Sequence, residues 1–164
     1  MKKITFFYFL LFSGMVFAQM PEKNGKFIYE NVVQVENASQ NVLYKRALLF
    51  FAMNYKSAND VIQMKDEAAG SVVGKGVFKI TYYTRNPIIS HTISVFVKDG
   101  RYKYVITDFY YKDNQDKSFW LEDFPKIWFG KQTLYSAVNV QVENLINNLA
   151  KFMSQETETE SDDW

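Results

Sequence analysis

The stretch that decides the fold runs from Ile88 to Lys112 and reads IISHTISVFVKDGRYKYVITDFYYK. Two runs rich in β-branched and aromatic residues flank Asp99-Gly100, and such a connection predicts a β-hairpin with a type I′ turn. If Lys98 pairs with Arg101, the register of both strands follows. The pairs expected on the core face are Val97 with Tyr102, Val95 with Tyr104, Ile93 with Ile106, and His91 with Asp108. Those expected on the half-exposed face are Phe96 with Lys103, Ser94 with Val105, Thr92 with Thr107, and Ser90 with Phe109.

The remaining apolar patterns place strands and helices on both sides of this hairpin. Apolar residues at helical spacing predict helices over 40–54, after the cap-forming residues Asn37-Ala38-Ser39, and over 133–153. Patterns rich in β-branched and aromatic residues predict strands over 27–35, 61–67 and 71–84. Gly74 and Gly76 fall on the apolar side of the last of these strands, which indicates a bulge or a close approach by another backbone, here that of the first helix.

The order strand, helix, four strands, helix predicts an α+β fold. Antiparallel hairpins that form a curved sheet with both helices on one face are the natural way to bury these apolar surfaces. We expect residues 19–153 to form this single domain. Its core would lie in 27–112, followed by an aromatic-rich connection in 113–132 and the terminal helix in 133–153.

The start of the chain has the pattern of an export signal. Lys2 and Lys3 precede an apolar run, and Val16-Phe17-Ala18 resembles a cleavage site, so we expect cleavage before Gln19. The apolar run is short for a bilayer span, so we expect no transmembrane anchor once residues 1–18 are removed. The chain has no cysteine, which excludes disulfides, thiolate metal sites and a lipid-bearing cysteine after the signal. These features predict a periplasmic or secreted protein.

Charge is distributed unevenly along the chain. Removing Lys2 and Lys3 from the 19 basic residues leaves 17 against 18 acidic ones, so the basic excess of a nucleic-acid-binding protein is absent. The segment 154–164, SQETETESDDW, holds five carboxylates and no base, and its composition predicts a disordered acidic tail. The preceding body has the opposite net sign, so a tail that lies on the body is the alternative.

Two phrases of the sequence resemble a known family. They are VLYKRALLFF at 42–51 and VKDGRYKYVITDF at 97–109, and the resemblance extends over residues 27–111. The family comprises exported bacterial domains of unknown function with a TATA-box-binding-protein-like (TBP-like) fold. The resemblance implies this fold and an exported setting. It implies no catalytic residue or cofactor, and a DNA-binding role does not follow from the fold.

No pattern in the sequence predicts catalysis, a metal or a cofactor. His91 is the only histidine, and its expected neighbour Asp108 would orient it as in a catalytic base pair. No nucleophile motif accompanies the two residues, so we interpret them as a structural pair across two strands. One histidine and no cysteine exclude the usual zinc ligand sets, and the polar loop 113–117 lacks the glycine and terminal glutamate of a helical-hand calcium site.

Two surfaces are candidate interaction sites. The second face of the hairpin contributes Phe96, Val105, Phe109 and Tyr111, and the connection contributes Trp120 and Trp128. Exposed apolar groups mark binding sites, although the rings of the connection would also suit the gap between sheet and last helix. The first hypothesis is a non-enzymatic binding or protein-interaction module, with a homodimer as one form of it. The alternative is a carrier that holds a small apolar ligand between helix and sheet, as helix-grip proteins do.

Overall fold

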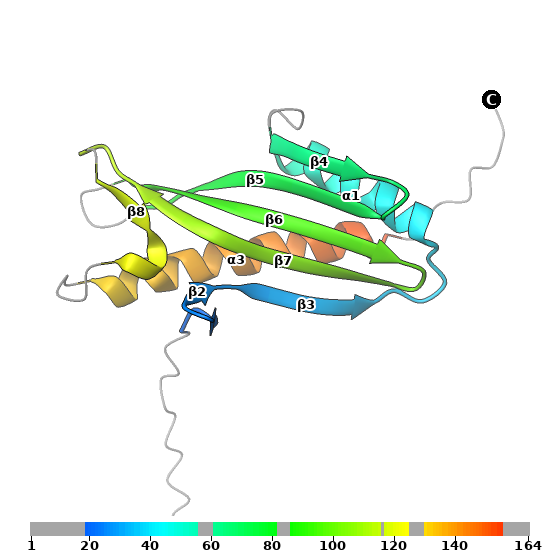
Figure 1. Cartoon of the computed structure of the whole chain (residues 1–164), viewed down its shortest axis with the longest axis horizontal. Helices are drawn as coiled ribbons and strands as arrows, with labels where there is room; N and C mark the ends of the chain where they lie inside the picture. The colour runs from blue at the N-terminus through cyan, green and yellow to red at the C-terminus, as the bar shows by residue number, and fades with distance from the viewer. Residues whose placement is uncertain (1–18, 56–60, 82–85, 116, 125–129, 156–164) are drawn as a thin grey trace, which may run out of the picture.

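The computed structural model describes residues 19–55, 61–81, 86–115, 117–124 and 130–155. These residues form one main antiparallel sheet, two long helices and a small two-stranded ribbon (Figure 1). The ribbon consists of β1 (Glu22–Lys23) and β2 (Lys26–Phe27). The helices are α1 (Gln40–Asn54), α3 (Lys131–Met153) and the 3-10 turn η1 (Leu121–Asp123). The strands of the main sheet are β3 (Tyr29–Gln34), β4 (Ile62–Asp66), β5 (Ser71–Lys79), β6 (Ile88–Lys98), β7 (Arg101–Lys112) and β8 (Ser118–Trp120).

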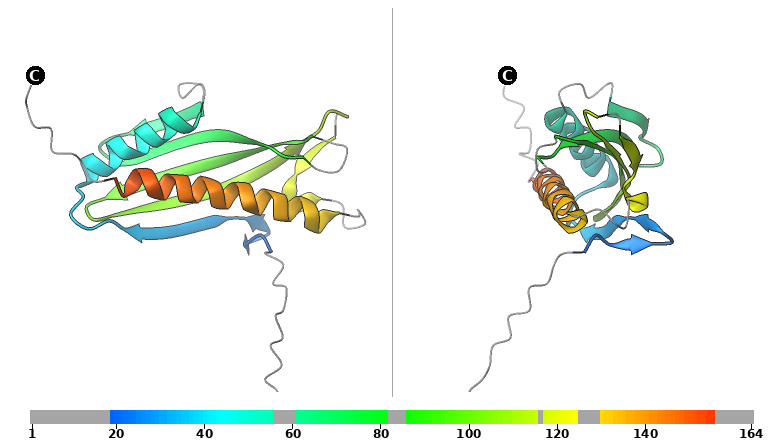
Figure 2. Two further views of the ribbon diagram at one scale, coloured as in Figure 1. Left: turned by 180° about the vertical axis from the view of Figure 1, so that it is seen from behind. Right: turned by 90° about the vertical axis from the view of Figure 1, so that its left-hand side faces the viewer.

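Both long helices cover the same face of the main sheet. The strand order is β3-β7-β6-β5-β4, and β8 pairs with the far part of β7, beyond the end of β3. Figure 2 shows that the sheet is curved and that α1 and α3 lie on one side of it. The helix α1 packs against β5, β6, β7 and α3. The predicted α+β fold is confirmed, and we call the sheet face away from the helices the open face.

The helices follow the sequence pattern that predicted them. Ser39 is the N-cap of α1, where its Oγ accepts a hydrogen bond of 3.4 Å from the backbone N–H of Val42. The buried residues of α3 repeat every three or four positions along the whole helix. Within the described ranges, no helix combines the length and the apolar character that a membrane span requires.

The central hairpin has the predicted register over most of its length. From Lys98 opposite Arg101 to Thr92 opposite Thr107, every expected pair is present. The expected type I′ turn is wrong, because only Gly100 (φ +73°) has a positive φ at the turn. Contacts with the segment before α1 hold this turn: the Gly100 N–H donates to the Ala38 carbonyl at 2.8 Å, and Asp99 Oδ1 accepts from the Gln40 N–H at 2.7 Å.

Beyond Thr107, a β-bulge breaks the expected register. Asp108 adopts a left-handed conformation (φ +57°), and Ser90 pairs with Tyr110 instead of Phe109. The bulge places one extra residue in β7 and reverses the alternation of every side chain after it. The predicted pairs of His91 with Asp108 and of Ser90 with Phe109 are therefore wrong.

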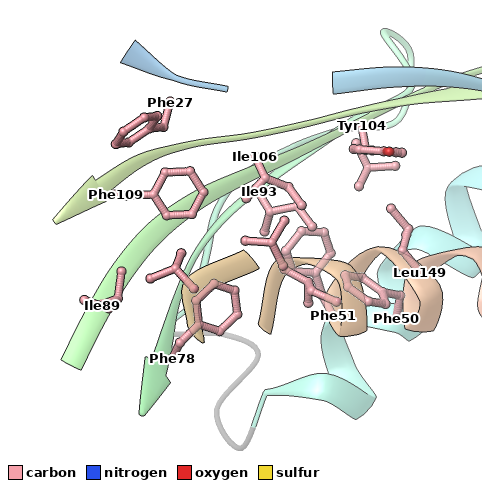
Figure 3. Close-up of a cluster of buried hydrophobic side chains, with 14 of the residues drawn as sticks. Phe27, Phe50, Phe51, Phe78, Ile89, Ile93, Tyr104, Ile106, Phe109 and Leu149 are labelled. Atoms are coloured by element: carbon pink, nitrogen blue, oxygen red, sulfur yellow. The ribbon is translucent and has the colours of Figure 1, made fainter. Parts of the chain in front are cut away.

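The core lies between the sheet and the two helices. Phe50 and Phe51 from α1 belong to the same buried cluster as Ile93, Ile106 and Phe109 from the sheet, and all five side chains are fully buried (Figure 3). Such close packing supplies most of the free energy that stabilises a domain of this kind.

Two glycines of β5 leave room for aromatic rings packed against the sheet. A Cβ atom at Gly74 would lie 2.5 Å from a ring atom of Phe51. A Cβ atom at Gly76 would lie 2.7 Å from Nε2 of His91 and 2.7 Å from Cε1 of Tyr55, the residue after α1. The nearest atoms at both glycines belong to side chains, so the glycines make room for the rings of Phe51, Tyr55 and His91 and not for the expected backbone of the helix.

Candidate functional site

The open face exposes large apolar side chains on several strands. Phe96 of β6 points away from the helices because side chains alternate along a strand and its neighbours Val95 and Val97 are buried. Val77 and Trp120 reach the same face because they pair with open-face residues of β6 and β7. The exposed fractions are 41% for Phe96, 50% for Trp120 and 56% for Val77. Apolar side chains gathered on one face are typical of an interaction surface.

Three of the predicted interaction residues lie on the open face. Phe96 and Trp120 are exposed, and Val105 is half-buried between neighbouring side chains on the same face. Trp120 owes its position to β8, a short strand that the sequence did not predict, which pairs it with Tyr110 of β7.

Two other predicted interaction residues lie on the opposite face. Phe109 and Tyr111 are fully buried in the core, so their assignment to an exposed surface is wrong. The cause is the bulge at Asp108, which turns both side chains toward the helices and brings Tyr110 to the open face in their place. The remaining predicted residue, Trp128, lies outside the described residues.

The first hollow on the open face adjoins the bulge, and we call it the bulge hollow. It measures about 680 Å³, and it is lined by Lys75, Ser90, His91, Thr92, Asp108, Tyr110 and Trp120. The Trp120 ring packs edge-on against Tyr110 with the ring centroids 5.1 Å apart. The Asp108 carboxylate lies 3.7 Å from Nζ of Lys26. An aromatic surface beside hydroxyls and a charged pair suits a ligand that has both a flat apolar side and hydrogen-bonding groups.

A second hollow lies near the hairpin turn, and we call it the basic hollow. It measures about 310 Å³, and its lining includes Val32, Phe96, Lys98, Arg101 and Lys103. Nζ of Lys103 makes an ion pair of 2.8 Å with Glu30, which Lys23 also contacts at 2.7 Å. Hydrogen bonds from Lys103 and Lys23 hold the pKa of Glu30 at about 2, so this carboxylate stays ionised. The hollow combines an apolar floor with a cationic rim and is suited to an anion that carries an apolar group.

The predicted pair of His91 and Asp108 does not form. His91 is 2% exposed and stacks on Phe78 with the ring centroids 4.1 Å apart, whereas the Asp108 carboxylate faces Lys26. Neither nitrogen of the His91 ring has a hydrogen-bond partner within the described part of the chain. Burial lowers the pKa of His91 from 6.5 to about 4, and an interaction with the Ile89 backbone offsets only part of this shift. A neutral imidazole enclosed by the core, without the carboxylate partner, is poorly placed for acid-base catalysis.

The polar loop after β7 has a structural role. The Asp113 side chain is buried, and its Oδ1 accepts hydrogen bonds from the backbone N–H groups of Gln115 (2.9 Å) and Lys117 (3.0 Å). Oδ2 of the same residue accepts a hydrogen bond of 3.1 Å from the Tyr111 hydroxyl. The carboxylate therefore closes the loop that turns β7 into β8. The described residues contain no cluster of three or more histidine, aspartate or glutamate side chains arranged to hold a metal ion.

The fold and the sequence have counterparts among known proteins. A family model described as "Domain of unknown function (DUF4468) with TBP-like fold" matches residues 29–112. A TBP-like protein from Parabacteroides distasonis superposes with a TM-score of 0.74 at 19% identity, covering 82% of this chain and 96% of that one. A DUF4468 family protein from Bacteroides ovatus superposes with a TM-score of 0.69 at 17% identity, covering 85% of this chain and 92% of that one. None of the curated proteins compared with the sequence matches it significantly.

Proposed function

The chain belongs to the DUF4468 family of domains of unknown function with a TBP-like fold, and we propose that it is a non-enzymatic binding module whose open face contacts the partner. The observation that carries this proposal is the placement of both long helices on one face of the sheet. The other face keeps Val32, Val77, Phe96 and Trp120 exposed to between 41% and 56%. Exposure of such residues disfavours the isolated protein and favours a complex that covers them.

The environment of the ionisable residues supports a binding role over catalysis. His91 stacks on Phe78 in the core, whereas the Asp108 carboxylate lies 3.7 Å from Nζ of Lys26. Catalytic groups need access to a substrate and a matched partner. His91 borders the bulge hollow but is only 2% exposed, and its ring nitrogens have no hydrogen-bond partner among the described residues. The open face offers instead a broad surface with apolar and charged side chains, as protein partners require.

The packing of the core does not favour the carrier alternative. The space between the sheet and α1 is filled by fully buried side chains such as Phe50, Phe51 and Ile93. The bulge hollow and the basic hollow lie on the open face, and the groove of about 830 Å³ between β3 and α3 is an open surface groove with amide and charged side chains in its lining. A carrier of helix-grip type needs an enclosed apolar cavity between helix and sheet.

Photochemical cross-linking at matched positions tests the proposed surface. A photoreactive amino acid replaces Val77 on the open face (56% exposed) or Val140 on α3 (53% exposed) in the full chain within its native cells. We expect a discrete adduct from position 77 and none from position 140. An adduct with twice the mass of the chain would identify a second copy as the partner.

A second substitution separates specific contact from mere proximity. Phe96→Ser or Trp120→Ser, combined with the photoreactive group at position 77, is expected to lower the adduct yield at least tenfold, because aromatic side chains dominate binding at interfaces. Val140→Ser is the control for loss of an exposed apolar group. Adducts of equal yield from both faces, or a yield that Phe96→Ser and Trp120→Ser leave unchanged, would show that the open face is not the binding surface.

We also propose that the protein works outside the cytoplasm after removal of residues 1–18. The basis is the sequence pattern alone, which has the charged start, the apolar run and the cleavage site of an export signal. Mass spectrometry of the protein from its native cells is expected to find Gln19 as the first residue. A cytoplasmic protein that retains Lys2 and Lys3 would contradict the proposal.

A further inference from the structure

The basic hollow carries positive charge that its surroundings leave without a counterion. Lys98 and Arg101 lie on its rim, and neither makes an ion pair with any described residue. Only Lys103 is neutralised, by Glu30. The floor consists of Val32 and Phe96, which are 50% and 41% exposed. An occupant of this hollow should therefore bring carboxylates together with an apolar group.

A segment of the same chain has this chemistry. Residues 154–164, SQETETESDDW, contain five carboxylates, no basic residue and the aromatic Trp164. The body that precedes them carries an excess of basic residues once residues 1–18 are set aside. The charge and the apolar content of the segment both complement the basic hollow.

The end of α3 lies close to the basic hollow. A groove between the edge of β3 and α3 is lined by Gln34, Val35, Lys151 and Ser154, so the chain leaves α3 beside the end of β3. Gln34 pairs with Arg101, and the Val35 N–H donates a hydrogen bond of 2.8 Å to the Gly100 carbonyl. The end of α3 and the turn of the hairpin lie at the same end of the molecule (Figure 2).

The length of the segment is sufficient for the path from α3 to the hollow. The groove beside α3 and the basic hollow lie on opposite faces of the sheet, and β3 is the outer strand at this edge, so the segment has to pass around β3 to reach the hollow. Nine extended residues span roughly 30 Å. This length is several times the spacing between neighbouring strands of a sheet, so it is enough to pass around one strand. Attachment to α3 also keeps the segment at a high effective concentration near the hollow, so weak contacts suffice for binding.

We propose that residues 156–164 bind to the basic hollow of their own chain. Their carboxylates pair with Lys98 and Arg101, and the Trp164 ring packs on Phe96 and Val32. The bound segment covers one end of the open face, which any partner at that end would have to displace. The segment can bind to the basic hollow whether or not the open face also binds a partner.

Paramagnetic labelling tests this contact, because a protein without cysteine accepts a single label cleanly. A nitroxide on Ser161→Cys of the full chain, isotopically labelled for NMR, is expected to broaden the amide signals of residues 96–103 at low salt. Raising the salt from about 20 mM to 500 mM should reduce this broadening at least threefold, because ions screen exposed charge pairs. The double variant Lys98→Gln with Arg101→Gln should reduce it to a similar extent.

Two controls make the result decisive. Lys79→Gln with Lys112→Gln removes the same charge at the other end of the open face, and this variant should retain the broadening at residues 96–103. A mixture of isotope-labelled chain without nitroxide and unlabelled chain with nitroxide should show none. The proposal is overturned by broadening in the mixture, which would mean contact between copies, by broadening centred elsewhere, or by none at all. It is also overturned if both double variants behave alike.

Discussion

Replacing Gly76 by valine is expected to lower the free energy of unfolding by about 3 kcal/mol. A Cβ atom at this position would lie 2.7 Å from ring atoms of both His91 and Tyr55, which is closer than real Cβ contacts allow. Both rings are packed: His91 lies between β5 and the core, and Tyr55 stacks on Phe51 with the centroids 5.9 Å apart. The end of α1 would therefore have to move away from the sheet. Chemical denaturation followed by circular dichroism measures the loss.

Lys75→Val is the matched control for this substitution. Lys75 neighbours Gly76 on β5, but its side chain is exposed on the open face, so valine there meets no core atom. We expect its free energy of unfolding to change by about 0.5 kcal/mol or less. The loss of free energy of unfolding for Gly76→Ala should lie between the losses for Gly76→Val and Lys75→Val. Alanine adds the same Cβ atom as valine but without its two further methyl groups. If Gly76→Val proved as stable as Lys75→Val, Tyr55 and His91 would not pack against β5 as described.

Lowering the pH from 6.5 to 4 is expected to remove about 3 kcal/mol of stability through His91 alone. The pKa of His91 is about 4 in the folded protein, because burial disfavours the imidazolium, and 6.5 is its ordinary value in an unfolded chain. The unfolded state therefore binds the proton first. The contribution of His91 is complete above pH 6.5 and decreases as the pH falls toward 4. Denaturation curves at half-unit pH intervals measure this dependence.

His91→Leu isolates the histidine from the carboxylates that titrate in the same range. Leucine fills a similar volume, so we expect a change of less than about 1.5 kcal/mol at pH 7. Between pH 6.5 and 4, the free energy of unfolding of His91→Leu should fall less steeply than that of the natural chain. Because His91 is the only histidine, the difference between the two curves reports its titration. Parallel curves would mean that His91 is accessible to protons in the folded state.

The architecture could be predicted from the sequence because the turn residues and the alternation of apolar residues indicate the same fold. The Asp99-Gly100 turn set a register that is correct for seven residue pairs, from Lys98 with Arg101 to Thr92 with Thr107. Gly74 and Gly76 indicated a crowded part of the sheet, although side chains of Phe51, Tyr55 and His91 fill this space and not the backbone of α1. Local turn chemistry and alternation determine such features, so they are readable from one sequence.

The bulge could not be read in the same way. Asp108 and the aromatic residues after it are compatible with either register, because Phe109, Tyr110 and Tyr111 form an unbroken run that presents a ring to both faces. A signal was nevertheless present: regular alternation placed a carboxylate in the core, whereas aspartate tolerates the left-handed conformation that a bulge requires. The same error placed Phe109 and Tyr111 on the wrong surface, so the candidate site was only half predicted.

The pairing of β3 with β7 also bears on when the protein can fold. Residues 29–34 of β3 pair with residues 101–106 of β7. The ribosome therefore makes β3 long before it makes the strand that pairs with it. Contacts so distant along the chain form slowly, and β3 has no partner in the sheet until β7 has been made. During synthesis, β3 therefore has to wait for the strand that holds it in the sheet.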